Sequence, residues 1–147
     1  MGFLTDTPLD VSRLVAEVLA SDRGGIAAFV GTVRDHHQGR PVRELEYTAY
    51  GAMAEAECGR IVEETERRWP VRVALSHRLG LLAIGDAAVA IAVAGSHRDE
   101  AFAACRHVIE ELKRRVPIWK RERYADGTVE WVGAGQAADL TVPGGRS

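Results

Sequence analysis

The spacing of apolar residues along the chain predicts three helices. Apolar side chains recur every three or four positions in residues 11–19, 53–69 and 99–115, the spacing that gives a helix one apolar face. Asp10 can cap the first helix and Gly24-Gly25 can stop it, while Pro70 and Pro117 follow the other two. The apolar face of the third helix is expected to hold Ala101, Phe102, Cys105, Val108, Ile109 and Leu112.

Other segments have the patterns of strands. Residues 26–33 and 87–95 are short apolar runs, and residues 44–49 and 71–75 alternate between apolar and polar, the period of a half-buried strand. Residues 118–124 and 128–132 flank Asp126-Gly127, a dipeptide that favours a hairpin turn. The polar stretch 35–41 predicts a loop. Residues 133–147, rich in glycine and alanine, predict a flexible tail after a domain of residues 1–132.

This order of elements predicts a single α+β domain with a mixed or antiparallel sheet. Several strands follow one another through short turns, whereas a doubly wound sheet would alternate strands with helices. A chain of 147 residues is long enough for one such domain with its own core. It contains no glycine-rich phosphate loop, dinucleotide fingerprint or zinc-ligand spacing, so no motif supports a nucleotide-binding protein or a zinc hydrolase.

Composition argues against nucleic-acid and membrane binding and indicates the cellular compartment. A formal net charge of -2 argues against nonspecific nucleic-acid binding. We see no signal peptide, and the most apolar stretch is too short to span a bilayer, so no membrane association is expected. The two cysteines, Cys58 and Cys105, lie on different predicted helices without metal-ligand spacing. We therefore expect a cytoplasmic protein whose cysteines are core residues.

Lysine is rare in this chain. Of nineteen basic residues only Lys113 and Lys120 are lysines, and they lie in one short segment. Chance survival of two lysines in an arginine-rich chain would explain scattered positions better than clustered ones. An amine can lose its proton when it is buried or placed beside another cation, which a guanidinium cannot do. The cluster therefore favours a functional site.

Basic residues also follow several predicted elements. Arg34 ends the first apolar strand, and His97-Arg98 lie between the most apolar strand and the third helix. Together with the two lysines they predict a pocket for a phosphate or a carboxylate. Alternatives remain open: Arg34 could simply be solvated, and nothing in the spacing ranks His77-Arg78 below His97-Arg98.

His36-His37 resembles a metal-ligand pair. Neighbouring residues point apart, however, and no third ligand is in register, so no metal site is expected.

A series of short motifs resembles one family. The motifs are Phe29-Val30-Gly31-Thr32-Val33-Arg34, Leu45-Glu46-Tyr47, His77-Arg78-Leu79-Gly80, Ser96-His97-Arg98, Leu112-Lys113 and Pro117-Ile118-Trp119-Lys120-Arg121-Glu122, followed by Gly127 and Trp131. In this order and spacing, over residues 24–131, the chain resembles the MoaE family, the catalytic large subunit of molybdopterin synthase. The Pro-Ile-Trp-Lys block with its upstream Leu-Lys is the most specific part.

The resemblance implies an α/β-hammerhead type fold and a sulfurtransferase. Two such chains would form the homodimer core of a heterotetramer, and each would bind a small ubiquitin-like sulfur-carrier subunit ending in Gly-Gly. The carrier's C-terminal thiocarboxylate would donate sulfur to cyclic pyranopterin monophosphate, without a resident cofactor or metal. Carried over by position, Lys113 and Lys120 would be catalytic. The substrate contacts would be Thr32, Val33, Arg34, His97, Arg98, Lys113, Lys120, Arg121 and Glu122.

One departure from the family pattern stands out. Some members carry a basic residue shortly after the last tryptophan, where this chain has Gly133-Ala134-Gly135. Two rival functions use the same pocket. The chain could be a noncatalytic binding module for a phosphorylated small molecule, or an interaction subunit that recognises an acidic protein C-terminus.

Overall fold

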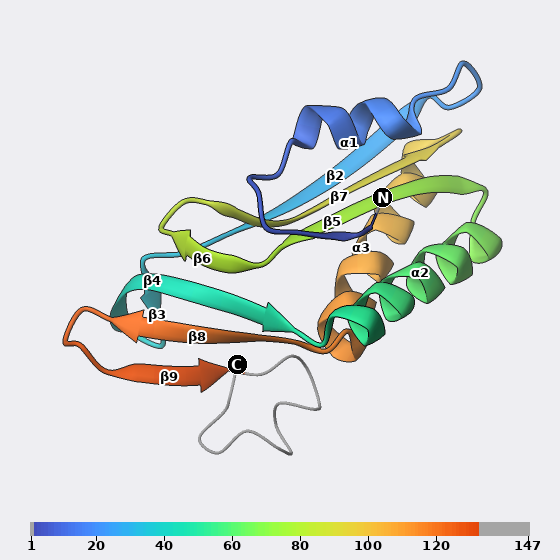
Figure 1. Cartoon of the computed structure of the whole chain (residues 1–147). Coiled ribbons are helices and arrows are strands. Elements are labelled where there is room, and N and C mark those ends of the chain that lie inside the picture. The colour runs from blue at the N-terminus through green and yellow to red at the C-terminus, as the bar shows by residue number, and fades with distance from the viewer. Residues whose placement is uncertain (1, 133–147) are drawn as a thin grey trace.

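The computed structural model describes residues 2–132, in which nine strands form two sheets (Figure 1). The first sheet has the order β1 (Leu4–Thr5), β5 (Val71–Arg78), β7 (Ala87–Gly95) and β2 (Gly25–Thr32). The second has the order β3 (His36–His37), β4 (Arg40–Ala49), β8 (Ile118–Tyr124) and β9 (Val129–Val132), and β6 (Gly80–Ala83) also pairs with β4. Among the strands of the described residues, only β1 and β5 pair in parallel. The predicted α+β class with mixed and antiparallel sheets is confirmed.

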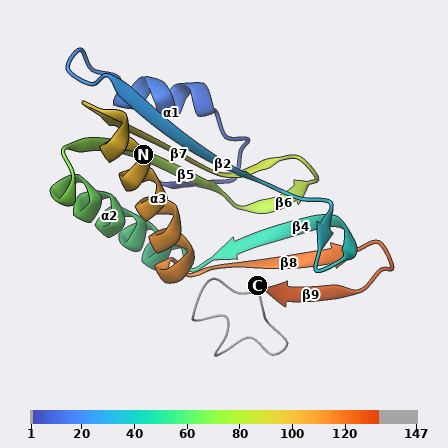
Figure 2. The same ribbon diagram turned by 180° about the vertical axis from the view of Figure 1, so that it is seen from behind.

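Three helices cover the first sheet within the described range: α1 (Val11–Val18), α2 (Gly51–Arg68) and α3 (Arg98–Arg115). Helix α1 packs on one face, whereas α2 and α3 lie together on the other (Figure 2). The Asp10 side chain accepts a hydrogen bond from the Arg13 N–H at 3.1 Å, as expected of a cap. The helix ends at Val18, before Gly24-Gly25, so the predicted stop was wrong. None of the described helices is both long and apolar enough to cross a membrane.

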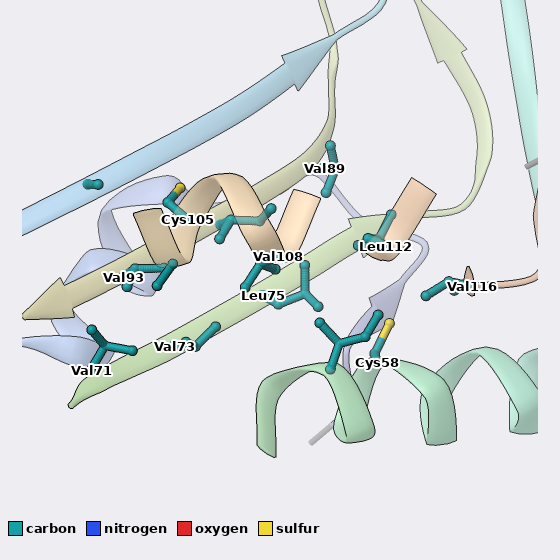
Figure 3. Packing of buried hydrophobic residues seen from close by; sticks show 14 of the residues in the cluster. Cys58, Val71, Val73, Leu75, Val89, Val93, Cys105, Val108, Leu112 and Val116 are labelled. Carbon is teal, nitrogen blue, oxygen red and sulfur yellow. The ribbon is translucent and has the colours of Figure 1, made fainter. Parts of the chain in front are cut away.

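The main core lies between the first sheet and the α2–α3 face (Figure 3). Ile61 and Val108 are fully buried there, and the Cys58 and Cys105 side chains are buried with them. Burial raises the pKa of both thiols, to about 12 for Cys58, where Glu55 and Glu57 add to the effect. This burial confirms the prediction that both cysteines are core residues. A buried thiol in apolar surroundings is a poor nucleophile.

Several local predictions were wrong. Phe102 is 64% exposed, because the buried face of α3 is centred on Ala101, Ala104, Cys105, Val108 and Leu112. Residues 71–75 were expected to form a half-buried strand, but Ala74 on its other face is also buried because α1 covers that face. The predicted loop 35–41 contains β3, which turns into β4 through Gln38 and Gly39, both with positive φ. The short strands β1 and β6 were not predicted, and residues 133–147 lie outside the described range.

The two sheets meet where α3 ends. The helix stops at Arg115, the Val116 N–H bonds to the Leu112 carbonyl, and β8 begins at Ile118 in the second sheet. Pro117 accounts for the break, since proline cannot continue the helical hydrogen bonding. The junction joins the last turn of α3 to β8 (Figure 1). Lys113 precedes it on α3 and Lys120 follows it on β8.

Candidate active site

Three cations meet at the junction of the two sheets. Lys113 lies on the last turn of α3, Lys120 on β8, and Arg34 just after β2. The Lys113 side chain is exposed as a whole, but partial burial of its amine lowers its pKa, and the charges of Lys120 and Arg34 lower it further. Like charges act this way only at short range. The structure therefore brings together these three members of the predicted pocket.

A buried carboxylate anchors Lys120. Side chains alternate along β8, so Lys120, Glu122 and Tyr124 share one face of the strand. Glu122 is 2% exposed, and its Oε2 lies 3.5 Å from the Lys120 Nζ. The Tyr124 hydroxyl donates a hydrogen bond of 2.7 Å to the other carboxylate oxygen, Oε1. The predicted site residue Glu122 is thus a support for Lys120, closed off from solvent.

Two residues near the lysines, the buried His77 and the half-buried Tyr47, were not assigned a role from the sequence. His77 ends the buried side of β5, and its Nδ1 lies 2.9 Å from the Arg78 carbonyl oxygen, which can only accept, so Nδ1 carries the proton. Burial, reinforced by the Lys113 charge, lowers the pKa of His77 to about 4. Tyr47 packs edge-on against that ring at 4.9 Å, and burial with the nearby Glu122 charge raises its pKa to about 12.

The alternation of buried and exposed positions in β5 could have predicted from the sequence that His77 is buried. It continues the buried series Val71, Val73 and Leu75, which places the imidazole on the same face as the core. The ring is therefore neutral at physiological pH and supplies an uncharged wall behind Lys113.

Of three further predicted contact residues, Thr32 is accessible, Val33 is closed to a ligand and Arg121 faces away from Lys120. Thr32 is exposed at the end of β2. Val33 is buried, and its N–H donates to the Asp86 carbonyl at 3.0 Å, so neither its side chain nor its amide is free. Arg121 lies on the opposite face of β8 from Lys120 and forms an ion pair of 2.6 Å with Glu46.

His97 and Arg98 lie at the far end of α3. Fifteen residues of helix separate Arg98 from Lys113, which is about 22 Å along the axis. The backbone of Arg98 lies beside Gly25, where β2 begins, while Arg34 follows the other end of that strand. One chain therefore does not join these two residues to the cluster, so the pocket expected from the sequence is not formed within a single chain.

The cluster has the chemistry of an anion site. Within residues 2–132, Arg34 and Lys113 form no ion pair, so their charges are available to a bound phosphate or carboxylate. No three His, Cys, Asp or Glu side chains of the described residues come together as metal ligands. His36 bonds to Asp35 at the surface while His37 is buried, so the two rings point apart as expected.

Comparison with known proteins gives consistent matches. The family model described as "MoaE protein" matches residues 4–115. The chain is 49% identical to "Molybdopterin synthase catalytic subunit 1" of Mycobacterium tuberculosis over 88% of both chains. It is 41% identical to "Molybdopterin synthase catalytic subunit" of Halalkalibacterium halodurans, covering 88% of this chain and 83% of that one.

Solved structures agree. The chain resembles "Molybdopterin Synthase from Staphylococcus aureus" with a TM-score of 0.85 and 35% identity, over 90% of this chain and 96% of that one. A complex of subunits 1 and 2 of molybdopterin-converting factor from Helicobacter pylori aligns with a TM-score of 0.71 over 92% and 90% of the two chains. At 22% identity, the latter supports the fold alone.

Proposed function

The chain belongs to the MoaE protein family, and we propose that it is the catalytic subunit of a molybdopterin synthase. An enzyme role in molybdenum cofactor biosynthesis accords with the names of its relatives. The proposed reaction is a sulfur transfer from the C-terminal thiocarboxylate of a small carrier protein to cyclic pyranopterin monophosphate. The observation that carries this assignment is the cluster of Arg34, Lys113 and Lys120 over the buried Glu122.

The cluster suits both reactants because both are anions. A thiocarboxylate and a phosphate are each attracted by convergent cations, and arginine can bind a phosphate through two nitrogen atoms. We assign Arg34 to the phosphate. Sulfur arrives on the carrier, so the reaction needs no resident cofactor.

Lys113 is assigned to the reacting thiocarboxylate. Its lowered pKa makes the neutral amine more accessible than in an ordinary lysine. Such an amine can accept the acyl group, and in its protonated form it can stabilise the oxyanion that develops on the carbonyl. Lys120, held by Glu122 at 3.5 Å, is assigned to substrate positioning and proton transfer.

A second copy of the chain would complete the site. Strand β2 is an edge of the first sheet, and Ile26, Phe29 and Val30 on it are more than a third exposed. Long apolar edges are rarely left open, since their unpaired backbone groups bind other strands. Antiparallel pairing of two β2 strands about their middle would set Gly25 of one copy opposite Thr32 of the other.

That pairing would also bring His97 and Arg98 to an active site, although they lie far from Lys113 of their own chain. Both lie beside Gly25, so they would approach Arg34 of the other copy instead of their own. The homodimer is therefore proposed to build each site from two chains. The carrier's Gly-Gly tail would enter from outside, since glycines fit a narrow passage that side chains would block.

The substitution Lys113→Arg tests the function. It keeps a cation at the site but removes the amine, so product formation from carrier thiocarboxylate and pterin should fall about a hundredfold or more. The control is Arg114→Lys, a neighbouring exposed residue that pairs with Glu111. Near-normal turnover of Lys113→Arg would show that Lys113 contributes only its positive charge and that the amine itself is not required. Pterin binding without any turnover by the unmodified chain would favour the noncatalytic module, and carrier binding without pterin affinity would favour the interaction subunit.

A further inference from the structure

A buried histidine lies beside the carboxylate that anchors Lys120. His37 on β3 is 7% exposed, and its Nδ1 lies 3.8 Å from the Glu122 Oε2. This Nδ1 is buried and has no hydrogen-bond partner among residues 2–132. Buried polar atoms are nearly always paired, because an unpaired one loses its contacts with water without replacement. A nitrogen retained so close to a buried carboxylate points to a role that involves this carboxylate.

His37 and Lys120 converge on one oxygen atom. The Lys120 Nζ lies 3.5 Å from the same Oε2, while the other oxygen, Oε1, accepts the hydrogen bond from Tyr124. Tyr124 is itself held, because the Arg40 guanidinium lies 3.6 Å above its ring and its hydroxyl also lies 3.3 Å from Glu130. With Oε1 fixed, any change in the partner of Oε2 is transmitted to Lys120.

The backbone explains why His37 and not His36 faces the carboxylate. The β3–β4 hairpin turns tightly through two residues with positive φ, and the Val42 N–H bonds to the Asp35 carbonyl at 2.8 Å. Alternation along β3 sends the two histidines to opposite sides. His36 is exposed and bonded to Asp35, whereas His37 is buried with its Nδ1 near Glu122 of β8.

We propose that His37 is a positioning residue: its Nδ1–H holds the Glu122 carboxylate, and the carboxylate holds the Lys120 amine in place for substrate. Without that donor the carboxylate is free to turn toward Lys120 alone, and the amine shifts with it. The effect on turnover rests on the proposed function. The effect on the position of Lys120 does not.

The scarcity of lysine makes the position of Lys120 directly measurable. Because the chain has only two lysines, protein grown with ¹³C,¹⁵N-lysine gives two lysine spin systems, assigned with Lys120→Arg. His37→Phe keeps an aromatic ring but has no donor, and should shift the Lys120 signals while leaving those of Lys113 in place. His37→Asn, whose amide can replace the Nδ1–H, should restore the native Lys120 signals. The matched control is His36→Phe, which should change neither.

Kinetics of the assembled synthase give a second readout. His37→Phe should lower kcat about tenfold, equivalent to ~1.4 kcal/mol. It should change the KM for the pterin much less than kcat, because Lys120 stays in the site and Arg34, which is assigned to the phosphate, is unchanged. In a Glu122→Gln background the same substitution should have no further effect, because His37 acts through that carboxylate.

Several results would overturn the proposal. One is a set of Lys120 signals that His37→Phe leaves unchanged in a folded protein. Another is a fall in activity that His37→Asn does not rescue, or one that persists in full in the Glu122→Gln background. If His37→Phe does not fold, ¹⁵N spectra of the wild-type imidazole decide, since an unprotonated Nδ1 could not donate to the Glu122 carboxylate and would contradict the proposal. Should the wild-type chain form no product at all, the proposed function fails, and the lysine spectra still test His37.

Discussion

Two impaired variants of this chain should restore activity to each other within one dimer when substrate is below saturation. In Arg98→Ala and Lys113→Ala, the substituted positions lie about 22 Å apart along α3. Antiparallel pairing of β2 edges would bring Arg98 of one copy toward Arg34 and Lys113 of the other. Each site would then take its lysine from one chain and its arginine from the partner.

The size of the effect follows from this geometry. Loss of the arginine removes a charge-assisted contact with phosphate and should weaken substrate binding about ten- to a hundredfold. Loss of Lys113 should cost about 10²–10³ in kcat. A heterodimer of the two variants contains one site with both residues intact and one site lacking both. It should therefore work at about half the rate of the wild-type dimer, since a two-fold dimer has two equivalent sites.

The assay requires heterodimers purified through two different tags, one on each variant. They are supplied with thiocarboxylated carrier and cyclic pyranopterin monophosphate, and product is measured per dimer. The matched control pairs Lys113→Ala with Lys120→Ala, which damage the same half of the site and should not complement. A heterodimer of Arg98→Ala and Lys113→Ala no more active than its parents would refute the shared site.

Three further predictions use other parts of the chain. Burial and neighbouring cations lower the pKa of Lys113, so the folded protein binds fewer protons there than the unfolded chain. The free energy of unfolding should therefore rise with pH, from the lowered pKa up to the usual lysine value of about 10.4. Lys113→Met should remove this pH dependence and increase Tm at pH 7 while abolishing turnover. An unchanged Tm with an unchanged pH dependence would show that the protonated amine of Lys113 does not destabilise the folded protein. The double variant Cys58→Ser, Cys105→Ala should retain turnover if it folds, because both thiols are buried with raised pKa values; lost turnover at unchanged thermal stability would indicate a persulfide mechanism. Val30→Lys places a charge on the exposed β2 edge and should convert dimers to monomers in sedimentation velocity, whereas a dimer of unchanged affinity would place the interface elsewhere.

The sequence alone determined the long elements of the described residues and the pair of lysines. Helical and strand periods are local properties, so the apolar spacing located all three helices and the buried strand β7 before any packing was known. Lys113 and Lys120 are separated by a break at Pro117, and a connection this short holds the end of a helix close to the start of the next strand. Their proximity was therefore readable from the chain.

Tertiary structure decided which side chains share an environment. Phe102 fits an apolar arc as well as Ala104 does, but only the placement of α3 on its sheet determined which of the two is buried. His77 reaches the lysines from β5, a strand far from them in sequence, and His37 reaches Glu122 through a hairpin read as a loop. The length of α3 places His97 and Arg98 at the opposite end of this helix from Lys113. Periodicity fixes which residues of one element share a face, whereas the neighbour that covers this face depends on packing between elements remote in the chain.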